Sequence, residues 1–319
     1  METTMDKPFE NTLLKAGDLN KNLVVVDADL SRVCETNLFA SKYPERYINI
    51  GVAEANMVSI SAGLALSGKT VFCGTFAGFI TLRAGDQVSV GVAYMQTDVK
   101  LCGFEAALVS GANGATHQCM EDLAIMRSMP NMRVYDPVDA TDLCAIIEYE
   151  ATHPGPAYLR GIRKTVPVIL DPQKYHFLPG KAFQVREGID VTLIASGMML
   201  ARAISAAEQL VAENITARVI SMSCLKPIDS QAILLAAAET GCIVTAENHS
   251  ILGGLGSAVA EVVTDNNPVP VLRVGIKDIF GEVGKDDYLA QKFEIGVSDI
   301  VQAARKAITL KHKQPKRLG

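Results

Sequence analysis

The pattern of apolar and polar positions divides the first half of the chain into short apolar runs separated by segments of helical character. The runs have the length of strands, and most end at glycine, proline or acidic residues. They lie at residues 22–30, 70–76, 98–104, 132–137 and 156–161. The helices predicted between them lie at residues 54–66, 81–94, 120–129 and 139–149. Strands that alternate with helices across short connections predict a parallel, doubly wound α/β sheet.

The second half repeats this alternation after an irregular stretch. Residues 162–188 contain three prolines and no sustained period, which indicates a linker. Apolar runs then resume at residues 190–196, 217–222, 241–247 and 270–275. We therefore predict two parallel-type α/β domains. The first, doubly wound, covers residues 1–170, a linker covers 171–188, and a smaller α/β domain with a short basic tail covers 189–319.

Composition narrows the class of protein. With 319 residues, 49% of them hydrophobic and 20% charged, the chain can bury a large core. A net charge of -5 argues against a nucleic-acid partner, because such proteins present a basic face. The sequence lacks both a signal-peptide pattern and an apolar run of the roughly 18 residues that a membrane helix needs. The seven cysteines form no Cys-x-x-Cys pair, so we expect reduced thiols in a cytoplasmic protein without a zinc site.

The segment from Arg46 to Phe79 carries the first candidate chemistry. It places one carboxylate, Glu54, at the start of a predicted helix, and two aromatic residues, Phe76 and Phe79, at the end of the next strand. In open α/β sheets, ligands bind at this edge. An acid is also favoured in a first helical turn by the helix dipole, and paired phenylalanines are commonly core residues. The alternative that we favour is a buried acid working on a flat heteroaromatic ring held against Phe76.

Two further polar residues follow predicted strands. His117 lies in a glycine-rich loop at residues 109–118, whose glycines permit close approach of the backbone to a ligand. Arg160 ends the strand at 156–161 and either holds the anionic end of a substrate or pairs with a nearby acid. The sequence GGLG at 253–256 lacks the full dinucleotide-binding spacing, so it indicates a tight turn.

Five sequence blocks, taken together and in order, resemble the C-terminal half of a transketolase. They are GVAEANM (51–57), TFAGF (75–79), ANGATHQCMEDLAIMRSMPNM (112–132), PAYLRG (156–161) and ENHSILGGLGSAVAE (247–261). Any one block alone is weak evidence, but their coincidence is specific. The chain therefore resembles the C-terminal subunit of a split, two-subunit transketolase of the bacterial and archaeal type. In that resemblance, residues 1–170 are the pyrimidine-binding domain and residues 189–319 the transketolase C-terminal-like domain.

The resemblance implies thiamine diphosphate as the cofactor. Glu54 would hydrogen-bond a ring nitrogen of the aminopyrimidine and favour its imino form, which removes the proton from C2 of the thiazolium. Burial of this acid is required, because a solvated carboxylate would not keep the proton on the ring. Phe76 would stack on the pyrimidine, and Phe79 would line its pocket.

The resemblance also implies substrate contacts. His117 would lie near the hydroxyls of the substrate and share in catalysis, Asn113 would read a sugar hydroxyl, and Arg160 would lie near a terminal phosphate. At two positions where members of the family commonly carry cations for that phosphate, this chain has Phe9 and Glu105. A hydrophobe and an acid do not replace two cations, so we expect Arg160 and a partner subunit to hold the phosphate, or the terminal group to differ.

The family motif that holds the diphosphate and metal is absent from the sequence. The resemblance therefore implies an N-terminal partner subunit that binds the diphosphate. Mg²⁺ or another divalent cation would be bound mainly by that partner subunit. The resemblance also implies self-association through both domains and a heterotetramer. The expected reaction moves a two-carbon ketol unit from a ketose or ketose phosphate to an aldose or aldose phosphate. Alternatives are a deoxyxylulose-phosphate synthase-like or 2-oxoacid dehydrogenase β-like thiamine enzyme, or a non-enzymatic scaffold.

Overall fold

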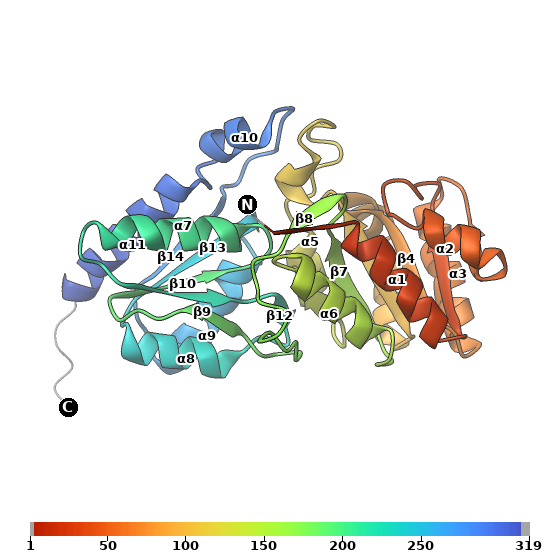
Figure 1. Cartoon of the computed structure of the whole chain (residues 1–319), viewed down its shortest axis with the longest axis horizontal. Helices are drawn as coiled ribbons and strands as arrows, with labels where there is room; N and C mark the ends of the chain where they lie inside the picture. Colours follow the sequence, from red (N-terminus) through yellow and green to blue (C-terminus); the bar gives the residue numbers. More distant parts are fainter. Residues whose placement is uncertain (1–2, 314–319) are drawn as a thin grey trace.

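The structure, a computed structural model, describes residues 3–313 and consists of two α/β halves side by side (Figure 1). The N-terminal half contains a seven-stranded sheet in the order β12-β6-β7-β5-β4-β2-β3. All neighbouring strands are parallel except β12, which runs antiparallel to β6. The strands are β2 (Leu23–Asp27), β3 (Tyr47–Asn49), β4 (Thr70–Phe76), β5 (Val99–Phe104), β6 (Arg133–Tyr135), β7 (Ala157–Gly161) and β12 (Cys224–Lys226).

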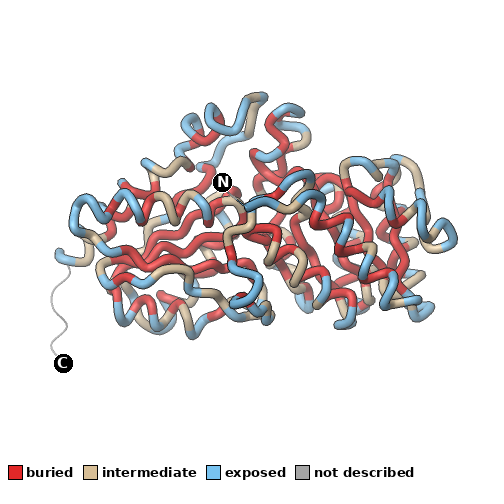
Figure 2. The backbone as a smooth tube through the Cα atoms, viewed as in Figure 1, coloured by how far each residue is buried: buried red, intermediate tan, exposed pale blue. Residues whose placement is uncertain are grey.

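Helices cover both faces of this sheet because its strands are apolar on both sides. In β2, Leu23 and Val25 pack into one apolar cluster with Phe9 of α1, whereas Val24 and Val26 pack into another with α3. Figure 2 shows the buried strands between half-exposed helices. The α-helices of this half are α1 (Pro8–Leu19), α2 (Asn37–Lys42), α3 (Glu54–Leu66), α4 (Gly85–Gln87), α5 (Asp122–Ser128) and α6 (Ala140–Glu150). The predicted doubly wound arrangement is confirmed.

The segment expected as one helix over residues 81–94 has a different helical form. Two π-helical segments, η2 (Phe79–Arg83) and η3 (Val88–Tyr94), flank the short helix α4. The backbone N–H of Ala84 bonds the carbonyl of Phe79, five residues back. Such wide turns are rare and are found mainly at functional sites. Two 3₁₀ turns, η1 (Pro44–Arg46) and η4 (Ala107–Ser110), also belong to this half.

The C-terminal half is a five-stranded sheet in the order β14-β13-β10-β11-β9. Its strands are β9 (Phe183–Arg186), β10 (Val191–Ala195), β11 (Ala217–Ser221), β13 (Ile243–Ser250) and β14 (Val271–Ile276). Helices α7 (Met199–Val211) and α11 (Val297–Lys313) cover one face, and α8 (Ser230–Glu239) and α9 (Leu255–Asn266) cover the other (Figure 1). A short helix, α10 (Asp286–Lys292), precedes α11. Strand β9 is antiparallel and lies within residues 171–188, which we expected to be only a linker.

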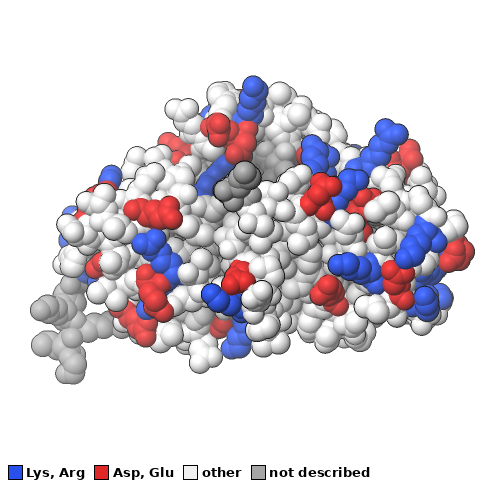
Figure 3. Space-filling view, in the orientation of Figure 1, with Lys and Arg blue, Asp and Glu red and all other residues white. Residues whose placement is uncertain are grey.

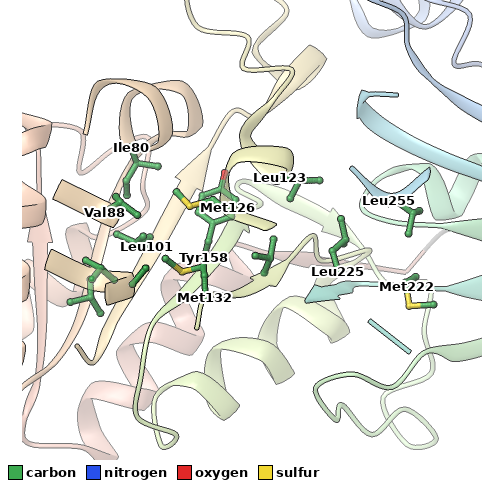
Figure 4. Close-up of a cluster of buried hydrophobic side chains, with 14 of the residues drawn as sticks. Ile80, Val88, Leu101, Leu123, Met126, Met132, Tyr158, Met222, Leu225 and Leu255 are labelled. Carbon is green, nitrogen blue, oxygen red and sulfur yellow. The ribbon is translucent and has the colours of Figure 1, made fainter. Parts of the chain in front are cut away.

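The two halves share one apolar core. A continuous cluster runs from Ile80 and Leu101 in the first half through Tyr158 to Leu225 and Leu255 in the second (Figure 4). Strand β12, from the second half of the sequence, completes the edge of the first sheet. The halves are therefore held in a fixed relation, which matters for any pocket between them.

The start and the end of the first half lie together, because strand β1 (Thr4–Asp6) pairs antiparallel with β8 (Thr165–Pro167). No helix within residues 3–313 has both the length and the apolar character to span a bilayer. On the face drawn in Figure 3, acidic and basic side chains are interspersed.

Candidate active site

Glu54 lies at the N-terminal end of α3, where a tight turn leads from β3 into the helix. Gly51 has φ +77°, in the left-handed region that favours glycine, and its N–H bonds the side-chain oxygen of Asn49 (2.9 Å). This turn places Glu54 as the first helical residue, and only 2% of the residue is exposed. The expected burial of this acid is therefore present in the fold.

The carboxylate of Glu54 has one bonded and one unbonded oxygen. Nη1 of Arg83 donates a hydrogen bond of 2.8 Å to Oε1. No side chain within residues 3–313 bonds Oε2. Oε2 therefore remains able to accept a hydrogen bond from a ligand donor.

Three aromatic side chains gather beyond the C-terminal end of β4. The ring centroids of Phe76 and Phe79 lie 5.3 Å apart, and the imidazole of His117 lies 5.0 Å from Phe76 and 5.2 Å from Phe79. The glycine-rich loop therefore brings His117 to the two phenylalanines, which the sequence places 38 residues away from it at the nearest. Nδ1 of His117 lies 3.0 Å from the hydroxyl of Thr116, and Nε2 has no partner in the described part of the chain.

A pocket of about 440 Å³ opens beside this aromatic group. Phe79, Arg83 and His117 line it, together with Gln118 and with Phe280 of the C-terminal half. We call it the aromatic pocket. Aromatic walls with a few polar groups are typical of sites for flat ligands.

Arg83 connects Glu54 to the aromatic pocket, and sequence reasoning assigned it no role. Its guanidinium carbon lies 4.0 Å from the ring centroid of Phe79, a cation–π contact. Half of its side chain is exposed (51%) although its partner carboxylate is buried. The one sequence signal was the spacing of four between Phe79 and Arg83, which puts both on one side of a helical segment.

Asn113 and Arg160 line a different, larger pocket of about 650 Å³ between the two halves. We call it the interdomain pocket. Asn113 is exposed, and its Nδ2 donates to the hydroxyl of Ser110 (3.0 Å). The glycine-rich loop thus separates the predicted site residues, because Asn113 and His117 lie on different pockets although they are four residues apart.

Arg160 is part of a buried ion network. Its Nε and Nη2 donate to the two carboxylate oxygens of Asp122 (2.8 and 2.6 Å), and Nη1 donates to Asp136 (3.4 Å) and to the carbonyl of Asn248 (3.0 Å). Burial alone would raise the pKa of Asp122, but the charge and hydrogen bonds of Arg160, together with His249 and Tyr158, outweigh burial and lower the pKa. Pairing with nearby acids, one of the two sequence interpretations of Arg160, is therefore present. Contact with a substrate stays a prediction.

The two positions where cations were missing from the sequence differ in their surroundings. Phe9 is a core residue, packed edge-on against Phe104 at 4.9 Å. Glu105 lines the interdomain pocket and accepts a hydrogen bond from Nε of Arg163. The fold therefore brings a cation from the end of β7 to the acid that follows β5.

These residues fit the aminopyrimidine end of thiamine diphosphate. A buried acid with an unbonded oxygen is joined through Arg83 to a pocket with aromatic walls, which suits a flat ring that carries hydrogen-bond donors. Within residues 3–313 no group of three or more histidine, cysteine or acidic side chains is arranged to hold a metal ion.

Two protein families match the chain in sequence. Residues 1–168 match the pyrimidine-binding domain of transketolase, and residues 180–300 match its C-terminal domain. A 6-deoxy-6-sulfo-D-fructose transketolase subunit, SqwH, from Clostridium sp. (strain MSTE9) is 42% identical over 97% of this chain and 99% of that protein. An apulose-4-phosphate transketolase subunit from Phocaeicola vulgatus is 40% identical over 85% of this chain and 87% of that protein.

A solved structure agrees with these matches. It is described as a split gene transketolase, inactive beta4 tetramer, is 43% identical, and superposes with a TM-score of 0.87 over 95% of this chain and 97% of that one. The chain therefore belongs to the transketolase family and corresponds along nearly its whole length to the subunits of split transketolases that carry the pyrimidine-binding and C-terminal domains.

Proposed function

We propose that this chain is the C-terminal subunit of a thiamine diphosphate-dependent transketolase that is active only with an N-terminal subunit. It would transfer a two-carbon ketol unit from a ketose or ketose phosphate to an aldose or aldose phosphate. The observation that carries this proposal is the buried Glu54, which has one unbonded carboxylate oxygen and is joined through Arg83 to the aromatic pocket.

Glu54 is proposed as the residue that activates the cofactor. When bound, thiamine diphosphate supplies the carbanion chemistry of ketol transfer. Oε2 of Glu54 would share a proton with a ring nitrogen of the aminopyrimidine, and its burial keeps water from competing for that proton. Phe76 would stack on the ring and Phe79 would line its pocket, which fits their contact at the end of β4.

The substrate contacts are proposed on two sides of the glycine-rich loop. His117 would hydrogen-bond a substrate hydroxyl and move a proton there through Nε2, which has no partner among the residues described. Asn113 and Arg160 would face the distal part of the sugar in the interdomain pocket. Both relatives compared above are named for sugars with an acidic group, a sulfo group in one and a phosphate in the other. We propose a sugar of that kind as a substrate here.

The partner is proposed to be an N-terminal transketolase subunit that holds the diphosphate. Mg²⁺ or another divalent cation would be bound mainly by that subunit. Self-association through both domains of this chain would complete a cytoplasmic heterotetramer. The solved relative described as an inactive tetramer of beta chains supports both points, since that chain self-associates and is inactive in that form.

The test compares the chain alone with the chain mixed with an N-terminal subunit, thiamine diphosphate and Mg²⁺. We expect ketol transfer from a ketose phosphate or sulfo-ketose only in the mixture. Turnover of pyruvate or another 2-oxoacid in place of every ketose would instead assign a deoxyxylulose-phosphate synthase-like or 2-oxoacid dehydrogenase-like reaction. Failure of the mixture to bind thiamine diphosphate would overturn the proposal and favour a scaffold.

A further inference from the structure

The interdomain pocket carries an unusual density of charge for a cavity between two domains. Four cations line it, Arg160, Arg163, Lys164 and Arg202, together with three carboxylates, those of Glu105, Asp136 and Asp286. A pocket with such groups selects ligands by charge, because ion pairs there are only partly screened by water.

Two of the four cations are already held by several protein groups. Arg160 is held by two buried aspartates and a backbone carbonyl, as described above. Arg202 donates to Asp286 (2.8 Å) and to the carbonyl of Ile295 (3.3 Å). These pairs shape the pocket but leave little capacity for a ligand.

The other two cations have donors to spare. Nε of Arg163 donates to Glu105, but neither Nη1 nor Nη2 has a partner within residues 3–313. Three quarters of the Arg163 side chain is buried, so those donors are directed by packing. The next residue, Lys164, is exposed, and its ammonium has no partner in the same described range.

The backbone is strained at two residues beside the contact of Arg163 with Glu105, one after the end of β5 and one after the end of β7. Glu105 has φ +55° and Lys164 has φ +64°, both in the left-handed region that non-glycine residues rarely adopt. Such conformations cost free energy and cluster at functional sites. Here both residues also line the interdomain pocket.

We propose that Arg163 and Lys164 bind the negatively charged end of the sugar substrate, and that Glu105 sets the preference of the pocket for one negative charge over two. This inference rests on the proposed function and names its substrate class: a sugar with a singly charged terminal group, of which a sulfonate is the simplest.

The charge balance is the reason for this preference. Glu105 cancels the charge of Arg163, Asp286 cancels that of Arg202, and Arg160 is paired with both Asp122 and Asp136. Lys164 is therefore the one lining cation without a carboxylate partner in the described chain. A phosphate monoester carries a charge of about −1.5 to −2 at neutral pH, with a second pKa of about 6. A dianion would meet the carboxylate of Glu105 next to its binding donors, whereas a monoanion would be balanced by Lys164.

The experiment uses the complete two-subunit enzyme and three matched ketoses, with a terminal sulfonate, a terminal phosphate or a terminal hydroxyl. We expect kcat/KM for the sulfonate to exceed that for the phosphate by about tenfold at neutral pH. Lowering the pH from about 7.5 to about 5.5 should narrow this ratio, because the phosphate gains a proton. Groups of the enzyme that titrate over this range cancel in the ratio.

Variants assign the effect to named side chains. Glu105→Gln should lower the ratio of kcat/KM for the sulfonate to kcat/KM for the phosphate to about one or below, because the charge of Arg163 is then no longer balanced by a carboxylate. Arg163→Gln should lower kcat/KM for both charged ketoses by about tenfold or more and leave the neutral ketose within about twofold. Lys164→Met should also lower kcat/KM for both charged ketoses, but by less than Arg163→Gln does. This variant leaves the ion pair between Arg163 and Glu105 intact.

Matched controls come from an exposed ion pair on the C-terminal half. Arg305 donates through Nε and Nη2 to Glu213, as an arginine–glutamate pair away from both pockets. Arg305→Gln and Glu213→Gln should leave all three ketoses unchanged.

The outcomes separate the inference from the function on which it rests. Two results would overturn the inference but not the proposed function. One is a wild-type enzyme that turns over ketoses but prefers the phosphate. The other is a Glu105→Gln variant with the same sulfonate-to-phosphate ratio of kcat/KM as the wild type. A wild-type mixture that turns over none of the three ketoses would overturn the proposed function and this inference with it.

Discussion

Arg83 and Glu54 are joined by a hydrogen bond of 2.8 Å from Nη1 to Oε1, and their exposure is very unequal: 51% of the arginine side chain is exposed, against 2% of the glutamate side chain. The buried acid is thus balanced by a cation that solvent reaches easily. The same guanidinium lies over the ring of Phe79, 4.0 Å from its centroid, and both side chains line the aromatic pocket. Arg83 is therefore the protein partner of this carboxylate in the chain by itself.

The first prediction concerns the stability that this pair provides. Arg83→Met keeps the apolar stem over Phe79 but leaves a buried carboxylate without its cation. We expect the free energy of unfolding of the isolated chain to fall by about 1–3 kcal/mol, measured by urea denaturation. In the double variant with Glu54→Gln most of this loss should disappear, since no buried charge is left to balance.

Arg305→Met is the matched control for this prediction. Its side chain is exposed to the same extent, 51%, but its partner Glu213 is 37% exposed, so the loss should be much smaller than for Arg83→Met. Equal losses in Arg83→Met and Arg305→Met would contradict a special role for the burial of Glu54.

The second prediction concerns His117. His117→Asn keeps a polar side chain but removes the ring nitrogen that is free in the described part of the chain. We expect kcat/KM for the ketose donor to fall by about 10²-fold in the two-subunit enzyme, with thermal stability unchanged. His153→Asn is the control, because His153 also contacts an aromatic ring, that of Tyr149 at 3.7 Å, but lies outside both pockets. Equal activity of the two variants would remove His117 from the reaction.

The third prediction concerns the buried network around Arg160. Arg160→Met leaves the carboxylates of Asp122 and Asp136 uncompensated, and we expect a loss of about 3–5 kcal/mol in the free energy of unfolding. Arg160→Lys should recover little of it, because one ammonium cannot replace the paired bonds to Asp122 and reach the carbonyl of Asn248 as well. Urea denaturation measures both variants. A loss below about 1 kcal/mol would show that the network does not hold the two halves together.

The fourth prediction is a pH dependence that originates in Glu247. Burial raises the pKa of this carboxyl to about 7 from an ordinary value of 4.5, although the backbone N–H groups of Gly256 and Leu255 act in the opposite direction. Because the pKa is higher in the folded chain, the folded chain holds the extra proton. The contribution to stability is therefore fully present below about pH 4.5 and is lost as the pH rises through about 7.

The measurement is the difference in free energy of unfolding between wild type and Glu247→Gln across this pH range. We expect the difference to shift against the wild type by on the order of 3 kcal/mol between about pH 4.5 and about pH 8. Other titrating groups are common to both proteins and cancel. A difference that does not vary with pH would contradict the assignment.

The sequence predicted best where glycines and a single period delimit an element. The helix at residues 54–66 and the strand at 70–76 were predicted with the bounds that α3 and β4 have in the structure. Gly51 and Gly68, with φ of +77° and +87°, mark the two turns around the helix, and only glycine adopts such angles without strain.

Elements that depend on distant pairing escaped prediction. Strand β12 has three residues and exists because it pairs with β6, about 90 residues earlier in the chain. Strand β9 is likewise set by β11, and four residues give too short a pattern to identify a strand. The π-helical form of the segment after β4 has no sequence signal either, because hydrophobic periodicity does not separate it from an α-helix.

The candidate site shows the same limit. Glu54, Phe76 and His117 were singled out by sequence. Of these, His117 lines the aromatic pocket, Phe76 contacts the ring of His117, and Glu54 is bonded to Arg83, which lines the pocket. The contact of Glu105 with Arg163 could not be foreseen, because 58 residues separate them and only the parallel pairing of β5 with β7 brings their strand ends together.

The central claim is that the buried acid at position 54 activates the cofactor, and its most direct test is the rate of ketol transfer by a mixture of an N-terminal subunit with wild-type chain or with Glu54→Gln. Glu213→Gln serves as the control for a surface acid. We predict that Glu54→Gln lowers kcat by about 10³-fold or more while the variant still folds and binds its partner. A Glu54→Gln enzyme that turns over ketoses at the wild-type rate would contradict this claim.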